Sequence, residues 1–184
     1  MTHATIQCRS GHYFDFLNPH QSFVLVRDIA HSLAMQCRFN GHTAQFYSVA
    51  EHSVHCSHIV PPEDALTALM HDAAEAFIGD VAKPLKRLLP DYAEIENTVE
   101  EAIFDKLDIP FPFPPSVKEA DIRMLRLEQR DAMLSTDAWY GMDGLVFPDV
   151  NLRFWAPTEA KNQFLLRYAY LTGTLVEDIQ PRVQ

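Results

Sequence analysis

Apolar residues recur at helical spacing along most of the chain, and this pattern predicts a mostly α-helical protein. Within residues 26–37, for example, Ile29 and Leu33 fall on one helix face. Signals for strands are few, and residues 1–25 indicate turns or a short hairpin. The helices that the pattern predicts cover residues 26–37, 48–59, 63–78, 92–107, 116–134 and 158–171.

The expected fold class is all-α, with the whole chain of 184 residues forming one helical bundle as a single domain. The segment 109–115, IPFPFPP, is a stiff connector that is too short and too apolar to separate two domains. We expect a core over about 26–134 and a final helix over about 158–171.

Two of the predicted helices carry acids on the face that should be buried. In 63–78, Asp72 and Glu75 share a face with small and apolar residues, and Asp121 and Glu128 do the same in the helix that starts near residue 116. A buried carboxylate is costly unless it is paired, hydrogen-bonded or bound to a metal. These acids are therefore candidates for a functional site.

Histidines add to this picture, because all nine lie at or before position 71. His52, His55 and His58 belong to the predicted helix 48–59, and His71 precedes Asp72. Imidazole and carboxylate groups together suit Mn, Fe, Co, Ni or Zn better than Ca. The spacing does not choose among the first three histidines. An alternative is that the inward acids pair with Arg123, Arg126 or Arg130.

Charge and composition exclude several kinds of partner. The net charge of −10 argues against binding to nucleic acid polymers or to anionic membranes, which favour basic surfaces. No apolar run reaches the length of a membrane span, and the first residues lack the pattern of a secretory signal. The three cysteines form no CxxC pair and are expected to be reduced thiols. We therefore expect a cytoplasmic protein.

Three stretches of the chain resemble the HD-domain metal-dependent phosphohydrolases. They are SVAEHS (48–53), ALMHDAAEAFIGDVAKPLK (68–86) and VKEAD (117–121), within a match from about residue 28 to 131. The likeness is closest to the small bacterial and phage 5′-deoxynucleotidases. The ordered set H…HD…D is that family's metal signature, and the pattern HDxxExxxGDxxxPxK is specific. The resemblance implies an HD-domain helical bundle.

The resemblance also implies roles for individual residues. Glu75 matches the acid that orients or deprotonates the attacking water, and Asp80 matches a second acid on the leaving-group side. The cofactor expected is a divalent transition metal: Mn, Co, Zn, Fe or Ni. The implied metal ligands are His52, His71, Asp72 and Asp121.

Residues outside the metal signature are candidates for binding the substrate. By resemblance, Arg38 would hold phosphate, and Phe39 would pack near the sugar or the base. Lys83 or Lys86 would offset charge on the phosphoryl oxygens, and His42 would also reach phosphate. The alternative is that both lysines are solvated on a turn and that His42 is a loop histidine.

The expected activity is release of phosphate from deoxynucleoside 5′-monophosphates. One alternative is a phage-type triphosphohydrolase for dATP or other dNTPs, which would use additional Mg or Mn. Another is a non-catalytic module that binds metal and a nucleotide, and a third is a purely structural helical protein with buried ion pairs. Ala76 after Glu75 departs from the HDxxED pattern of the alarmone hydrolases, and the GYP stretch of cyclic dinucleotide phosphodiesterases is missing.

The last expectations concern the oligomeric state of the protein and the loops that surround the substrate. By resemblance we expect a homo-oligomer, at least a dimer. The aromatic segment 162–171, NQFLLRYAYL, would form that interface or instead close the core. The walls that select the substrate are expected from the loops 11–24 and 139–156.

Overall fold

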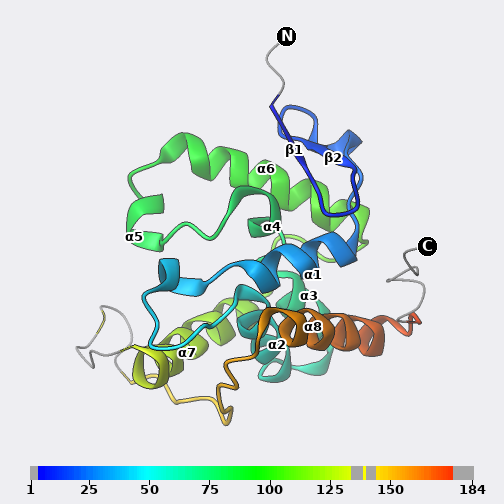
Figure 1. Cartoon of the computed structure of the whole chain (residues 1–184). Helices are drawn as coiled ribbons and strands as arrows, with labels where there is room; N and C mark the ends of the chain where they lie inside the picture. Colours follow the sequence, from blue (N-terminus) through cyan, green and yellow to red (C-terminus); the bar gives the residue numbers. More distant parts are fainter. Residues whose placement is uncertain (1–3, 134–138, 140–143, 176–184) are drawn as a thin grey trace.

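The computed structural model describes residues 4–133, 139 and 144–175, and these are mostly helical, as predicted (Figure 1). An antiparallel hairpin of β1 (Thr5–Gln7) and β2 (Tyr13–Asp15) precedes the helices, which confirms the expected hairpin. Short 3₁₀ turns cover Pro19–Gln21, Arg38–Gly41 and Pro62–Asp64. The helices are α1 (Val26–Met35), α2 (Val49–His58), α3 (Ala65–Met70), α4 (Glu75–Ile78), α5 (Lys83–Lys86), α6 (Pro90–Lys106), α7 (Pro115–Ala132) and α8 (Pro157–Thr172).

Local chemistry sets several helix ends. Ser48 lies outside α2 because its Oγ accepts the backbone N–H of Glu51 at 3.1 Å, so it is the N-cap of that helix. Proline opens the helices α6, α7 and α8, where its missing N–H costs nothing. The predicted end of α7 at Leu134 falls outside the described residues. Across the described ranges, none of the helices combines the length and apolar character of a membrane crossing.

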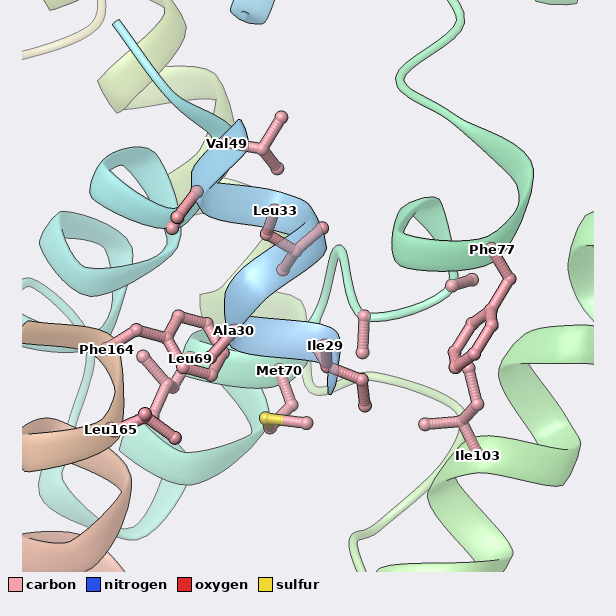
Figure 2. Packing of buried hydrophobic residues seen from close by; sticks show 14 of the residues in the cluster. Ile29, Ala30, Leu33, Val49, Leu69, Met70, Phe77, Ile103, Phe164 and Leu165 are labelled. Atoms are coloured by element: carbon pink, nitrogen blue, oxygen red, sulfur yellow. The ribbon is translucent and has the colours of Figure 1, made fainter. Parts of the chain in front are cut away.

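Helix α1 runs through the middle of the main apolar core. Figure 2 shows Phe164 and Leu165 of α8 on one side of α1, and Phe77 of α4 with Ile103 of α6 on the other. Helix α8 packs against α1, α2 and α3, and its residues Phe164 and Leu165 are fully buried. The segment 162–171 therefore closes the core, as one of the two expectations had it, and the oligomeric state remains a prediction.

The single helix predicted over 63–78 is wrong, because the chain forms α3 and α4 with a tighter turn between them. The backbone N–H groups of Ala73 and Glu75 bond to the carbonyl oxygens three residues earlier, at 2.8 and 3.0 Å. A three-residue repeat places residues i and i+3 directly above one another. Asp72 and Glu75 are thereby stacked on the same side. Gly79 ends α4 with a positive φ of 83°, a conformation that glycine adopts readily.

Candidate metal centre

The four residues expected to bind metal come together in the structure. His52 lies on α2, His71 and Asp72 lie in the turn between α3 and α4, and Asp121 lies on α7. The Nε2 atom of His52 is 3.3 Å from Nε2 of His71 and 3.4 Å from Oδ1 of Asp121. The Nε2 atom of His71 is 3.2 Å from Oδ1 of Asp72. Three elements that are distant in sequence thus supply one cluster.

The geometry also chooses among the three histidines of α2. His52 is completely buried and faces the cluster. His55 instead stacks on Trp155, with a ring-centroid distance of 5.5 Å, and His58 is exposed near the end of the helix. His52 is therefore the residue of α2 that belongs to the site, as the family resemblance implied.

The hydrogen bonds of both cluster histidines leave their Nε2 atoms available as ligands. The Nδ1 atom of His71 is 2.8 Å from the carbonyl oxygen of Ala68, and Nδ1 of His52 is 2.6 Å from Oε1 of Glu128. These acceptors assign the proton to Nδ1 in each neutral ring. The Nε2 lone pairs then face one another, and the buried Oδ2 of Asp72 has no hydrogen-bond partner. A cation among these atoms would bind the facing lone pairs and give Oδ2 of Asp72 a partner. The residues therefore fit a divalent metal.

Titration of the cluster agrees with a site for positive charge. Burial and Arg38 lower the pKa of His52, but Cys56, Glu128 and Asp121 raise it, and the result lies well above the ordinary value. Burial raises the pKa of Asp121, yet its hydrogen bond and charge interaction with His52 hold it well below its usual range. The negative charges around His52 therefore favour a cation at this position.

Glu128 supports His52 from behind. It is completely buried, and its Oε1 accepts hydrogen bonds from His52 and, at 2.9 Å, from the hydroxyl of Tyr47. Its Oε2 accepts from Nη2 and Nε of Arg38, at 3.1 and 3.3 Å. Burial raises the pKa of Glu128, but Arg38 and His52 lower it to about 2. The sequence marked this acid as inward without giving it a role; its place two helix turns after Asp121 was the available signal.

Of the predicted phosphate-binding groups near η2 (Arg38–Gly41), Arg38 lies beside the cluster. Its guanidinium is held by Glu128, and its Nη1 is 3.6 Å from Oδ2 of Asp72. Phe39 adopts a left-handed backbone conformation, and its ring lies 5.9 Å from that of Trp139. His42 is exposed at the end of the turn. The structure thus brings Arg38 to the site, whereas His42 does not reach the pocket.

A pocket of about 550 Å³ opens at the cluster. His71, Asp72 and Asp121 of the cluster line it, and its other walls come from α4, α5, α6, the connector before α7 and the first turn of α7. None of the described residues in 11–24 and 139–156 lines this pocket, so the expectation that these loops form the walls stays a prediction. Lys86 lines the pocket, whereas Lys83 is exposed on α5 and does not.

The two candidate acid–base residues differ in their position. Glu75 lines the pocket with only 8% of its surface exposed, and its Oε2 has no hydrogen-bond partner. Burial and the charges of Asp72 and Asp80 raise the pKa of Glu75 well above its ordinary value. Asp80 lies just beyond α4, where its N–H donates to Gln36 at 3.0 Å. Burial raises the pKa of Asp80 against the lowering effect of Arg38.

Cys56 is a potential ligand that the sequence analysis missed. Its Sγ is 3.4 Å from Nε2 of His52, and the buried group His52, Cys56 and His71 could hold a metal ion. The available signal was its position one helix turn after His52. Burial raises the pKa of this thiol to about 11, so the metal-free protein keeps it protonated.

Comparison with known proteins places the chain in a family without naming an activity. No family model matches it. The chain is 41% identical over 165 residues to the uncharacterized protein YfdR of Escherichia coli, covering 89% of this chain and 93% of that protein. It is 29% identical over 185 residues to the uncharacterized protein RCAP_rcc00048 of Rhodobacter capsulatus, with coverages of 90% and 94%. The chain belongs to the same family as YfdR.

Proposed function

We propose that this protein is an HD-domain, metal-dependent phosphohydrolase that removes phosphate from deoxynucleoside 5′-monophosphates. One observation carries the proposal: ligand-type side chains from three separate elements converge beside a pocket that three of them line. Two buried carboxylate oxygens there, Oδ2 of Asp72 and Oε2 of Glu75, have no hydrogen-bond partner. Such atoms are costly in a structural core and useful in a site that takes up a cation and a water.

The proposed ligand set is the one the family resemblance implies. A divalent transition metal (Mn, Co, Zn, Fe or Ni) held there would lower the pKa of a water molecule and neutralise phosphate oxygens. The carboxylates suit such a metal better than the protonated thiol of Cys56 does. The ligands proposed are His52, His71, Asp72 and Asp121.

The remaining residues of the site perform the proton transfers. Glu75 accepts a proton from the attacking water, whose oxygen forms a bond to phosphorus in line with the departing 5′ oxygen. Arg38 and Lys86 offset the charge on the phosphoryl oxygens. Asp80 gives a proton to the 5′ oxygen as the P–O bond breaks, leaving inorganic phosphate and a deoxynucleoside. The pKa values of both Glu75 and Asp80 are raised, chiefly by burial, which favours their exchange of protons with the substrate and the water.

The charge of the pocket favours a monophosphate over a triphosphate. Five carboxylates line the pocket, and the cationic side chains among the described lining residues, His71 apart, are Lys86 and Lys118. Each further phosphate of a substrate adds negative charge that these two lysines, together with Arg38 beside the cluster, do not balance. A triphosphohydrolase would need additional Mg or Mn ions in the same space.

The experiment measures phosphate release from deoxynucleoside mono-, di- and triphosphates with Mn²⁺ or Co²⁺. We expect release from monophosphates, abolished by EDTA and reduced at least about 100-fold by Asp72→Ala. The matched control is Glu119→Ala, which removes an exposed acid of α7 that does not line the pocket. Release from triphosphates alone would replace the proposal with the triphosphohydrolase. No release despite bound metal would overturn both in favour of a binding module.

A further inference from the structure

The proposed chemistry does not use the part of the pocket lining formed by α6 and the connector, which is here called the outer part. Its walls combine the aromatic and proline residues of the connector, residues 111–115, with Glu96 and Glu100 of α6. A pocket of about 550 Å³ lies within the range typical of small-molecule sites, so it can hold a whole nucleotide. With the phosphate at the metal cluster, the base of that nucleotide must lie toward these outer walls.

Phe111 offers an aromatic surface in this outer part. Phe111 is 40% exposed. The centroid of its ring lies 5.8 Å from that of Phe104, which is completely buried, and 5.4 Å from that of Phe113. A large apolar side chain that is fixed from behind and open to a polar pocket is suited to stack on a planar ring. Phe111 therefore provides the flat contact that a nucleobase requires.

Glu100 supplies a hydrogen-bonding group in the wall of the same pocket. The neighbouring Glu96 accepts from Nζ of Lys86 at 2.5 Å, whereas Glu100 makes no hydrogen bond or ion pair with the described residues. Burial and the charge of Glu96 raise the pKa of Glu100 to about 7. The nine-tenths-buried Glu75, with its unpartnered Oε2, lines the same pocket and marks it as built for a ligand.

We infer that Phe111 and Glu100 form a nucleobase subsite that favours bases with an exocyclic amino group: adenine, guanine and cytosine. This inference rests on the proposed function, whose substrate it narrows. The amino groups donate hydrogen bonds that the ionised carboxylate of Glu100, the main form above a pH of about 7, accepts. Thymine presents a single N–H between two carbonyl oxygens, and those oxygens would face the carboxylate and be repelled. The subsite thus disfavours thymine by placing its carbonyl oxygens against the carboxylate of Glu100. Such a repulsive polar contact discriminates more strongly than the shape of the pocket alone.

The test compares kcat/KM for dAMP, dGMP, dCMP and dTMP in the wild type and in matched variants. We expect the wild type to favour the amino-bearing bases at least about tenfold. Glu100→Gln should reduce that preference to less than about threefold, because the amide is both donor and acceptor. The control Glu101→Gln alters an exposed neighbour on α6 and should leave the preference unchanged. Phe111→Leu should raise KM for all four substrates by a similar factor.

Binding of deoxynucleosides, which carry no phosphate, separates this inference from the proposed function. Perturbation of NMR chemical shifts by deoxyadenosine but not thymidine, lost in Glu100→Gln, would support the subsite even if no nucleotide were hydrolysed. Hydrolysis of all four monophosphates within about threefold of one another would overturn the subsite and leave the phosphohydrolase standing. Failure of both hydrolysis and deoxynucleoside binding would overturn the two together.

Discussion

Cys56 and Asp121 compete for the same place beside His52. The Sγ of Cys56 and the Oδ1 of Asp121 are both 3.4 Å from Nε2 of that histidine. Burial raises the pKa of the thiol to about 11, whereas His52 overcomes burial and keeps the pKa of Asp121 below its usual range. The carboxylate is ready to bind a cation and the thiol must first lose a proton. We therefore expect Asp121, and not Cys56, to complete the ligand set.

Spectroscopy of the Co²⁺-loaded protein checks this assignment. The wild type should lack thiolate-to-cobalt charge-transfer absorption, and Cys56→Ala should bind Co²⁺ with unchanged affinity. Asp121→Asn should weaken binding at least about tenfold, because it removes a charged ligand. An intense charge-transfer band in the wild type that disappears in Cys56→Ala would instead place the thiolate on the metal.

At the scale of elements, one side chain of α2 binds the backbone of residues 153–155, which lead into α8. Glu51 of α2 is completely buried, and its Oε1 accepts the backbone N–H groups of Arg153 at 2.6 Å and Phe154 at 2.9 Å. Its Oε2 accepts the N–H of Trp155 at 2.6 Å. Three donors share one carboxylate, which ties the approach to α8 onto α2.

Removing this carboxylate should be costly. We expect Glu51→Ala to lower the free energy of unfolding by about 3–5 kcal/mol, because hydrogen bonds to charged groups are strong and three buried donors lose their acceptor. Urea unfolding measures the change, and Glu51→Gln should lose about half as much. Glu63→Ala, at an exposed position of η3, should stay within about 0.5 kcal/mol of the wild type. A loss below about 1 kcal/mol for Glu51→Ala would show that water replaces the carboxylate.

The break between α3 and α4 shows where prediction from sequence stopped. Three- and four-residue spacings both put Asp72 and Glu75 on the inner side, so the periodicity predicted the inward acids but not the tighter turn. The turn depends on α1: Ser32 donates to the carbonyl of Ala76 at 2.8 Å, and Gln36 donates to that of Glu75 at 2.9 Å. Contacts across 39 and 44 residues leave no trace in a local pattern.

The same limit applies to the site. Helices with strong periodicity, the cap at Ser48 and the stop at Gly79 were predictable because each depends on neighbouring residues. The ordered histidine and aspartate motifs predicted which side chains would meet. The approach of Cys56 to His52 follows from their spacing of one helix turn on α2, but the pairing of Glu128 with Arg38 depends on how α7 and the turn at η2 dock on α2. No spacing rule encodes that docking.

At the scale of the whole molecule, the cluster joins the two apolar cores. The main core includes residues of α1, α4, α6 and α8, and a smaller one is formed by α7 with Cys56 of α2 and Ala68 of α3. The proposed ligands come from α2, the turn after α3, and α7, so a bound metal links α7 to the rest of the bundle. Metal binding should therefore stabilise the entire fold and α7 most directly.

Unfolding in the presence and absence of metal tests this coupling. At a free metal concentration 100 times Kd, we expect the free energy of unfolding to rise by about 2.7 kcal/mol, since the unfolded chain does not hold the ligands together. EDTA should cancel the gain, and Asp121→Asn, which binds at least about tenfold more weakly, should gain at most about 1.4 kcal/mol at the same metal concentration. Hydrogen exchange in α7 should slow when metal is added, because opening that helix would break a ligand bond. Equal stability with and without metal, although dialysis shows the metal bound, would place the ion away from this cluster.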